Sequence, residues 1–176
     1  MYPVIRMLNE FRRFRRAPRL GPFDTHVSHH RCWPHDLDIW WELNNGRTLT
    51  LYDLGRLVLF QRIGFIPVMR AEGWRGTVAG SAVRYRRRIQ LWERIEMHSR
   101  LLGWDERFFY FDQSMWTGAG CAGQVLLRTA VTAGRGIVPA ADVARAMGLD
   151  PASPPLAVWV RAWIAAEAER PWPPQD

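Results

Sequence analysis

The chain has 176 residues, of which 48% are hydrophobic and 23% are charged. These values are typical of one compact folded domain with extensions, and they exclude an intrinsically disordered chain. No apolar run reaches the ~18 residues of a membrane-spanning helix, and arginines interrupt the first apolar residues, so we expect neither a spanning helix nor a secretory signal. Two cysteines, Cys32 and Cys121, are too few for a disulfide framework and fit a reducing cytoplasm.

Most of the net charge of +7 lies at the start of the chain. Residues 1–19 hold six arginines against one glutamate, and the rest of the chain is close to neutral. Every basic side chain is arginine, which fits a GC-rich genome as well as it fits phosphate binding. A basic arm on a nearly neutral body is not the charge layout of a nucleic-acid-binding domain, so we expect no nucleic acid as a partner.

Residues 2–16 predict a basic amphipathic helix, because Val4, Leu8 and Phe11 recur at helical spacing among the arginines. Its apolar face has two competing uses. It can lie on an anionic membrane, which would make the protein peripheral to the inner face of that membrane. It can equally pack on its own domain or on a second copy of the chain.

The next segments predict a strand and then a buried helix. The strand covers about Val27–Trp33, where Pro34 stops it. Asn44 and Asn45 are good N-cap residues for a helix over about 46–63, and that helix is apolar on most of its sides. A helix of this kind lies inside a protein rather than on its surface.

The second half of the chain predicts an antiparallel sheet. Four segments alternate between apolar and polar residues, the signal for half-buried strands: 78–89, 94–102, 107–117 and 121–133. Short helices follow at about 139–147 and 156–169. A four-strand meander can bury the central helix only by wrapping around it, so we expect an α+β hotdog fold. We expect three parts: a basic arm (1–22), the hotdog domain (23–134), and a helical extension with a Pro-rich tail (135–176). Exposed sheet edges favour a homodimer or a dimer of dimers.

Several motifs in this frame resemble those of the hotdog acyl-CoA thioesterases, a superfamily that includes the 4-hydroxybenzoyl-CoA thioesterase group. The family pattern D-x-D-x-x-G-H-V-N-N runs into its central helix. The matching segments here are Trp33-Pro34-His35-Asp36-Leu37-Asp38, Asn44-Asn45-Gly46-Arg47 and Tyr52-Asp53-Leu54-Gly55-Arg56. The segment from Arg100 to Asp105 and the run Arg86-Arg87-Arg88 further resemble the branch of thioesterase superfamily member 6. The resemblance covers roughly residues 25–134, and this chain has Trp41-Glu42 where the pattern often has Gly-His.

The resemblance implies hydrolysis of an acyl-CoA to free acid and coenzyme A. It implies that Asp38 is the general base or nucleophile, and that helix N-terminal amides near residues 44–46 polarise the thioester carbonyl. Asp36, two residues earlier, would point another way in an extended stretch. Asn45 would cap the helix or orient water, and Glu42 would act as a second acid or base. Spacing alone favours Asp36 and Asp38 as turn residues that bond their own backbone, and the resemblance reverses this for Asp38 and in part for Asp36.

Other polar residues have a binding and a structural interpretation. Arg86, Arg87 and Arg88 would grip the coenzyme A phosphates, or they form a solvated strand face. Asp53, with Arg56 three residues on, is first a structural ion pair and second another candidate carboxylate.

We expect no metal and no cofactor other than coenzyme A within the substrate. His26, His29, His30 and His35 do not have metal-ligand spacing. The alternative to an acyl-CoA thioesterase is a hotdog module without turnover, which binds acyl-CoA or lipid or acts as a membrane-associated scaffold.

Overall fold

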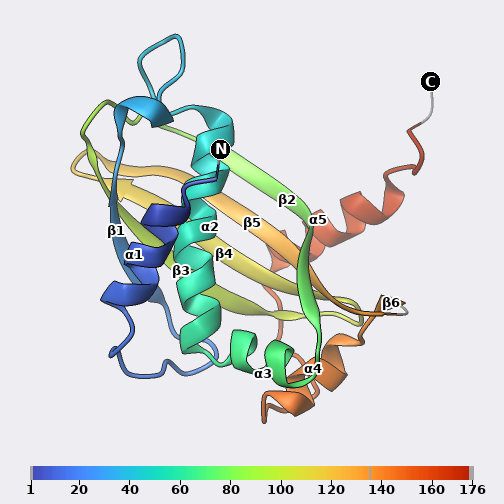
Figure 1. Cartoon of the computed structure of the whole chain (residues 1–176). Helices are drawn as coiled ribbons and strands as arrows, with labels where there is room; N and C mark the ends of the chain where they lie inside the picture. Colours follow the sequence, from blue (N-terminus) through green and yellow to red (C-terminus); the bar gives the residue numbers. More distant parts are fainter. Residues whose placement is uncertain (1, 135, 175–176) are drawn as a thin grey trace.

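The computed structural model describes residues 2–134 and 136–174, and shows a curved antiparallel sheet wrapped around one long helix (Figure 1). The elements in chain order are α1 (Val4–Arg13), β1 (His26–Arg31), the short 3-10 helix η1 (Pro34–Asp36), α2 (Asn45–Arg62), α3 (Phe65–Ala71), β2 (Arg75–Tyr85), β3 (Arg94–Trp104), β4 (Phe108–Thr117), β5 (Gly120–Ala133), β6 (Gly136–Ile137), α4 (Ala140–Ala146) and α5 (Val158–Glu169). The predicted hotdog fold is confirmed.

The order of strands in the sheet is β1-β3-β4-β5-β2, and β6 pairs with β5. The prediction of a four-strand meander is therefore wrong in one respect, because β2 pairs with β5 instead of β3. The edge of β3 that a meander would give to β2 is taken by β1. The connection over residues 86–93 is too long for a tight hairpin. It carries the chain from β2 at one edge of the sheet to β3, which lies beside β1 at the other edge. Residues 65–71 form the short helix α3, which the sequence did not indicate. Gly64, with a positive φ of 87°, separates it from α2.

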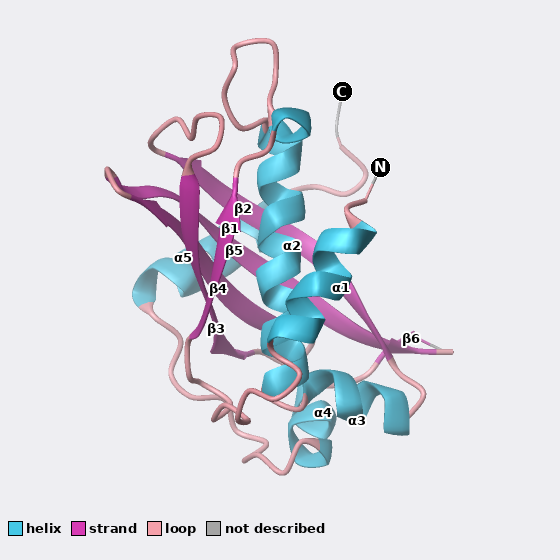
Figure 2. Ribbon diagram, turned by 60° about the vertical axis from the view of Figure 1, so that its left-hand side comes forward, coloured by secondary structure: helices cyan, strands magenta, loops and turns pink. Residues whose placement is uncertain are grey.

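Helix α2 starts where Asn44 caps it, with the Asn44 side chain accepting hydrogen bonds from the backbone N–H groups of Gly46 and Arg47. The sheet covers one side of α2 and α1 lies on the other (Figure 2). At Gly55 the helix lies directly against β3. A Cβ at this position would come within 2.5 Å of the Met97 sulfur, so only glycine fits without a shift of that side chain. This close approach fixes the position of α2, and therefore of its N-terminal end, relative to the strands.

A buried polar network ties the middle of α2 to the sheet. Arg56 donates to the side-chain oxygen of Gln113 at 2.9 Å, and it pairs with Asp53 on its own helix. The Gln113 amide nitrogen donates to the Tyr52 carbonyl and to the Ser99 hydroxyl, both at 2.8 Å. Asp53 therefore has the structural partner that its spacing predicted. Burial of Arg56 lowers its pKa from the ordinary value, while the Asp53 carboxylate opposes that shift.

Helix α1 lies beside α2 (Figure 2), and two of its arginines reach the edge of the sheet at β1. Arg6 donates to the carbonyl of Arg31 at 3.0 Å, and Arg13 donates to the carbonyl of His29 at 3.1 Å. These carbonyls belong to the side of β1 that faces away from β3. Packing on its own domain is thus one use of α1, whereas Ile5 and Leu8 remain exposed on its outer side. No helix among residues 2–134 and 136–174 combines the length and the apolar character needed to cross a bilayer.

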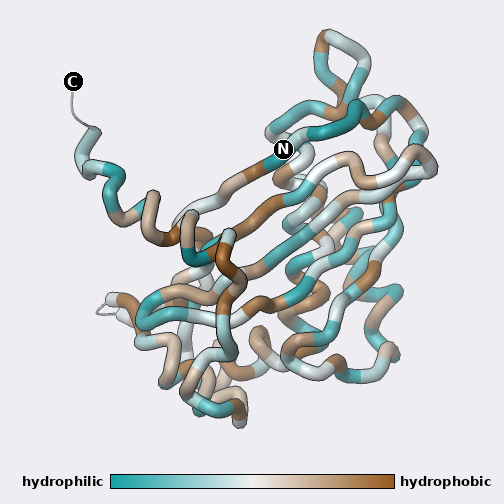
Figure 3. Tube along the Cα trace, turned by 180° about the vertical axis from the view of Figure 1, so that it is seen from behind, coloured by the Kyte–Doolittle hydropathy of each residue, from teal (hydrophilic) through white to brown (hydrophobic). Residues whose placement is uncertain are grey.

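Within the C-terminal extension, α4 joins the main core, and α5 packs on the outer face of the sheet. Val160, Trp163 and Ile164 of α5 contact Tyr110 and Leu126 of the strands. Figure 3, seen from behind, shows α5 leaving this outer face toward the C terminus. The outer face is therefore partly covered, and the concave face holds α2.

Candidate active site

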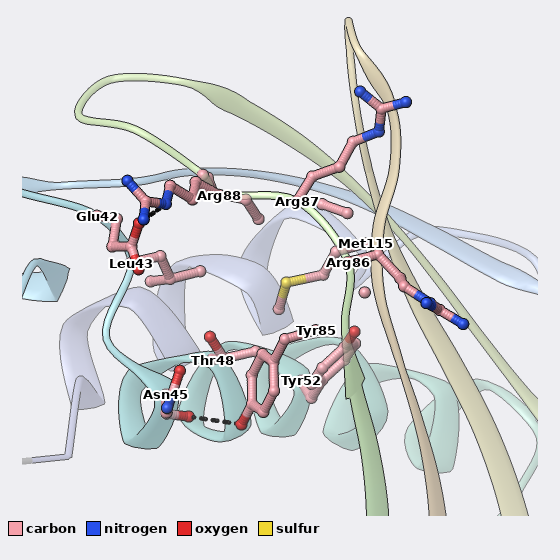
Figure 4. A pocket seen from close by; sticks show the side chains of 13 residues that line it. Glu42, Leu43, Asn45, Thr48, Tyr52, Tyr85, Arg86, Arg87, Arg88 and Met115 are labelled. Atoms are coloured by element: carbon pink, nitrogen blue, oxygen red, sulfur yellow. Dashed lines mark hydrogen bonds and ion pairs between the residues drawn. The ribbon is translucent and has the colours of Figure 1, made fainter.

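A cavity of about 220 Å³ opens beside the N-terminal end of α2 (Figure 4). Its walls come from α2, the loop before it, the end of β2 and the facing strands β4 and β5. Buried apolar side chains form the floor, and charged side chains surround the mouth. The lining residues are Glu42, Leu43, Asn45, Thr48, Tyr52, Tyr85, Arg86, Arg87, Arg88, Ile89, Met115, Ala122 and Gly123.

The mouth of the cavity is cationic. The backbone N–H groups of Arg86 and Arg87 both donate to the carbonyl of Ala122, at 2.8 and 3.0 Å. Two amides on one carbonyl interrupt the regular ladder, and Figure 4 shows the three arginine side chains diverging from this segment. Arg88 pairs with Glu42 at 2.8 Å. Arg86 and Arg87 have no acidic partner within the described part of the chain, so their guanidinium groups are available to an anion.

Asp38 lies in the loop before α2 but not among the residues that line the cavity. One oxygen of its carboxylate accepts from the backbone N–H of Trp40 at 2.8 Å and of Glu42 at 3.5 Å. Its own N–H donates to the carbonyl of Glu42 at 2.9 Å. The Asp38 carboxylate thus bonds the backbone of its own turn, as the structural interpretation of this residue predicts. Glu42 lies where the loop returns, and its carboxylate lines the cavity mouth.

Asp36 is buried, and its carboxylate joins three segments of the chain. It contacts Arg6 of α1 at 2.7 Å and Arg47 of α2 at 3.2 Å, and it accepts from the N–H of Trp33 at 3.1 Å. A carboxylate held by two arginines at this depth fastens the loop to both helices. Asp36 thus pairs with arginines of two helices, whereas Asp38 bonds the backbone of its own loop. Neither side chain lines the cavity.

The two asparagines divide the roles that the sequence left open. Asn44 is the N-cap of α2, and its side-chain oxygen accepts hydrogen bonds from the N–H groups of Gly46 and Arg47, at 2.8 and 3.2 Å. These two amides are therefore not free to bind a thioester oxygen. Asn45 is the first residue of α2, and its exposed side chain lines the cavity.

Among the lining residues that were not predicted as site residues, three carry a hydroxyl group: Thr48, Tyr52 and Tyr85. Asn45, Thr48 and Tyr52 are three and four residues apart, so helical spacing places them on one face. That spacing was a signal for this wall of the cavity. Tyr85 could not be found in the same way, because it enters from β2 through the unexpected strand order.

Two of the histidines are held by contacts within the fold, and Cys32 is buried. His30 bonds the Ser28 hydroxyl at 2.9 Å, and His26 bonds Arg62 at 2.9 Å. Burial lowers the pKa of His30 to about 3 and that of His26 to about 4. Burial also raises the pKa of the Cys32 thiol to about 11, which makes it a poor nucleophile.

Comparison with solved structures defines the class of fold. The probable thioesterase YbaW of Escherichia coli superposes with a TM-score of 0.65 and 15% sequence identity, covering 69% of this chain and 96% of that one. The DHNA-CoA thioesterase of Staphylococcus aureus gives a TM-score of 0.59 at 14% identity, covering 82% and 91%. At these identities the likeness establishes the shared hotdog fold.

The sequence then places the chain in a family. The family model of the Thioesterase-like superfamily matches residues 32–164, and the chain belongs to this superfamily. Protein THEM6 of Xenopus laevis is 42% identical over 80 residues, which is 46% of this chain and 39% of that protein. Protein THEM6 of Danio rerio is 37% identical over 87 residues, or 49% and 43% of the two chains. The matches thus span less than half the length of these relatives.

Proposed function

We propose that this protein hydrolyses an acyl-CoA thioester to a free acid and coenzyme A. The observation that carries the proposal is the composition of the cavity at the start of α2. It has an apolar floor for an acyl group, a cationic mouth, and one carboxylate, Glu42, among the described residues that line it. Membership of the Thioesterase-like superfamily supports this chemistry.

In the proposed reaction Glu42 activates the attacking water. The carboxylate accepts a proton from water as the oxygen forms its bond to the thioester carbon. The C–S bond then breaks, and the departing sulfur takes up a proton to leave as the thiol. The Asn45 side-chain amide, which lines the cavity, would donate to the oxygen on which negative charge builds. Arg88 holds Glu42 in position, and Asp38 holds the loop that carries it.

The coenzyme A portion would lie at the cavity mouth. Its phosphates are the anions that the guanidinium groups of Arg86 and Arg87 fit, since arginine binds phosphate through two parallel N–H groups. The acyl group then points inward toward the apolar floor. Because both arginines are exposed, this contact orients the substrate outside the cavity rather than closing over it.

A second copy of the chain is the proposed partner at the open edge of the sheet. Arginines of α1 occupy the β1 edge, whereas β2 pairs with β5 and, among the residues that the structure describes, has no strand on its other side. A long unpaired edge favours strand addition. Since the cavity lies at the end of β2, a copy paired there would also approach the cavity mouth. A dimer of dimers would need a further contact through another surface.

The test is release of free thiol from a panel of acyl-CoAs by the wild type, Glu42→Gln and Asp38→Asn. General-base catalysis contributes about 10²–10⁴-fold. We expect Glu42→Gln to lose at least about 100-fold and Asp38→Asn less than about tenfold, provided that both variants fold. The reverse pattern would keep the hydrolysis but assign the base to Asp38.

The second candidate is an acyl-CoA or lipid-binding module without turnover. The observation that favours it is the pairing of Glu42 with Arg88, since a carboxylate oxygen that contacts a guanidinium group is occupied and does not contact an attacking water. The exposed apolar residues and arginines of α1 would then serve a scaffold on the inner surface of the cytoplasmic membrane. Tight binding of acyl-CoA with no thiol release over hours would favour this candidate over the enzyme.

A further inference from the structure

A second cavity, of about 430 Å³, lies where the C-terminal ends of α1 and α2 meet the start of α3 (Figure 1). This is the end of α2 opposite to the candidate active site. Four arginines line the cavity, and no carboxylate does so among the residues that the structure describes. The lining residues are Phe11, Arg12, Phe14, Arg15, Ala17, Pro18, Arg19, Val58, Gln61, Arg62 and Pro67.

One of the four arginines serves the fold. Arg62 donates to the carbonyl of Pro18 at 3.2 Å and to the Nδ1 atom of His26 at 2.9 Å. Its guanidinium group also lies over the ring of Phe14, 5.7 Å from the ring centroid. These contacts fasten the segment after α1 to the end of α2, so this wall of the cavity is fixed.

The other three arginines have no use within the fold. The side chains of Arg12, Arg15 and Arg19 are exposed, and they make no hydrogen bond or ion pair with any residue that the structure describes. On the same helix, Arg6 and Arg13 each pair with a carboxylate. Positive groups gathered at one cavity repel one another, and an anion bound among them removes this cost.

Apolar surface lies next to these arginines. Phe11 and Phe14 line the cavity and are half-buried. Earlier on α1, Ile5 and Leu8 are 84% and 59% exposed. Ile5, Leu8 and Arg12 are three and four residues apart, so they lie on one side of the helix. The outward side of α1 is therefore apolar toward its start and cationic toward its end, where the cavity opens.

We propose that this cavity binds the phosphate headgroup of an anionic phospholipid. Arg12, Arg15 and Arg19 would donate to the phosphate oxygens, which guanidinium groups bind through parallel N–H groups. The exposed apolar residues of α1 would contact the acyl chains at the membrane surface. Free phosphate or a nucleic acid would use the arginines and leave the apolar surface exposed, whereas a lipid covers both.

The proposal goes beyond the general attraction of a basic helix to a negatively charged membrane, because it assigns one lipid to one cavity. It also does not depend on the proposed hydrolysis. Lipid binding without thiol release would refute the enzyme alone, and thiol release without lipid binding would refute the cavity alone.

The experiment is a calorimetric titration of the full chain with dihexanoyl phosphatidylglycerol, below the concentration at which this lipid forms micelles. No membrane surface is then present. We expect saturable binding of one lipid per chain at about 0.15 M salt. Arg15→Gln should weaken this binding by about tenfold or more, because a contact between charged groups is lost.

Arg16→Gln is the matched control. Arg16 is the next residue along the chain and is also exposed, but it does not line the cavity. The variant changes the net charge by the same amount, and we expect it to weaken binding by less than about threefold, since salt screens a charge outside the site. Both variants should keep the urea midpoint of the wild type, because neither side chain has a partner in the described part of the fold.

Three results would overturn the proposal. One is a wild type that shows no saturable binding of the lipid. Another is equal weakening by Arg15→Gln and Arg16→Gln, because surface charge alone would then explain the binding. The third is inorganic phosphate that binds as tightly as the lipid, since the cavity would then be a site for free phosphate. Co-sedimentation with phosphatidylglycerol vesicles should place the two variants in the same order as the titration.

Discussion

Replacing Asp36 by Asn tests whether this residue is a structural fastener. The side chain is 1% exposed, while those of Arg6 and Arg47 are 18% and 22% exposed. The variant keeps the shape and the acceptor for the N–H of Trp33, but it loses two charge-assisted contacts, each worth about 1.5–3 kcal/mol. The arginines recover part of this by hydration, so we expect a loss of about 2–4 kcal/mol in the free energy of unfolding. At this chain length, each kcal/mol lowers Tm by about 2–4 °C.

Urea unfolding followed by circular dichroism measures this loss, with Asp142→Asn as the control. Asp142 pairs with Arg145 on α4, and both side chains are at least half exposed, so we expect a change below about 0.5 kcal/mol. A cost for Asp36→Asn below about 1 kcal/mol would refute the reasoning. The folded variant should also keep its activity within a few-fold. A loss of 100-fold without loss of stability would return Asp36 to the reacting groups.

Three further predictions concern packing, pH and the arm. Gly55→Ala should lower stability by about 1–2 kcal/mol in urea unfolding, since the new methyl meets Met97; a gain would refute the close packing. His26 and His30 have folded-state pKa values of about 4 and about 3, below the ordinary 6.5, so the unfolded state binds more protons in acid. The contribution of these histidines to stability is therefore full above pH 6.5 and should be lost as the pH falls to about 3, measured as the urea midpoint. Leu8→Asp should reduce co-sedimentation with anionic phospholipid vesicles, and equal sedimentation would rule out lipid contact by that side of α1.

The sequence predicted the elements of the fold better than their order. Alternation and helical spacing located the central helix and the main strands to within a few residues, because burial imposes these periods locally. The neighbours of β2 could not be read in this way. A strand that pairs across a sheet has no local signature of its partner, and α3 is too short to show a clear period.

The candidate site was predicted in part, for a related reason. Glu42, Asn45 and the three arginines were named from the sequence, and all line the cavity. Asp38 was named from the same motif, but its carboxylate bonds the backbone of its own loop. The motif fixes where a residue lies along the chain, whereas the turn geometry decides where its side chain points. Tyr52 follows from helical spacing only when the cavity is already known.

The arginines of α1 have a consequence for how many copies can associate. A sheet with two open edges can recruit a neighbour on each side and grow into a filament. Here Arg6 and Arg13 occupy outward carbonyls of β1, so this margin cannot template another strand. In the proposed assembly, strand addition would therefore be limited to β2 and would stop after one further copy. The arm would thus keep the proposed assembly from growing into a filament.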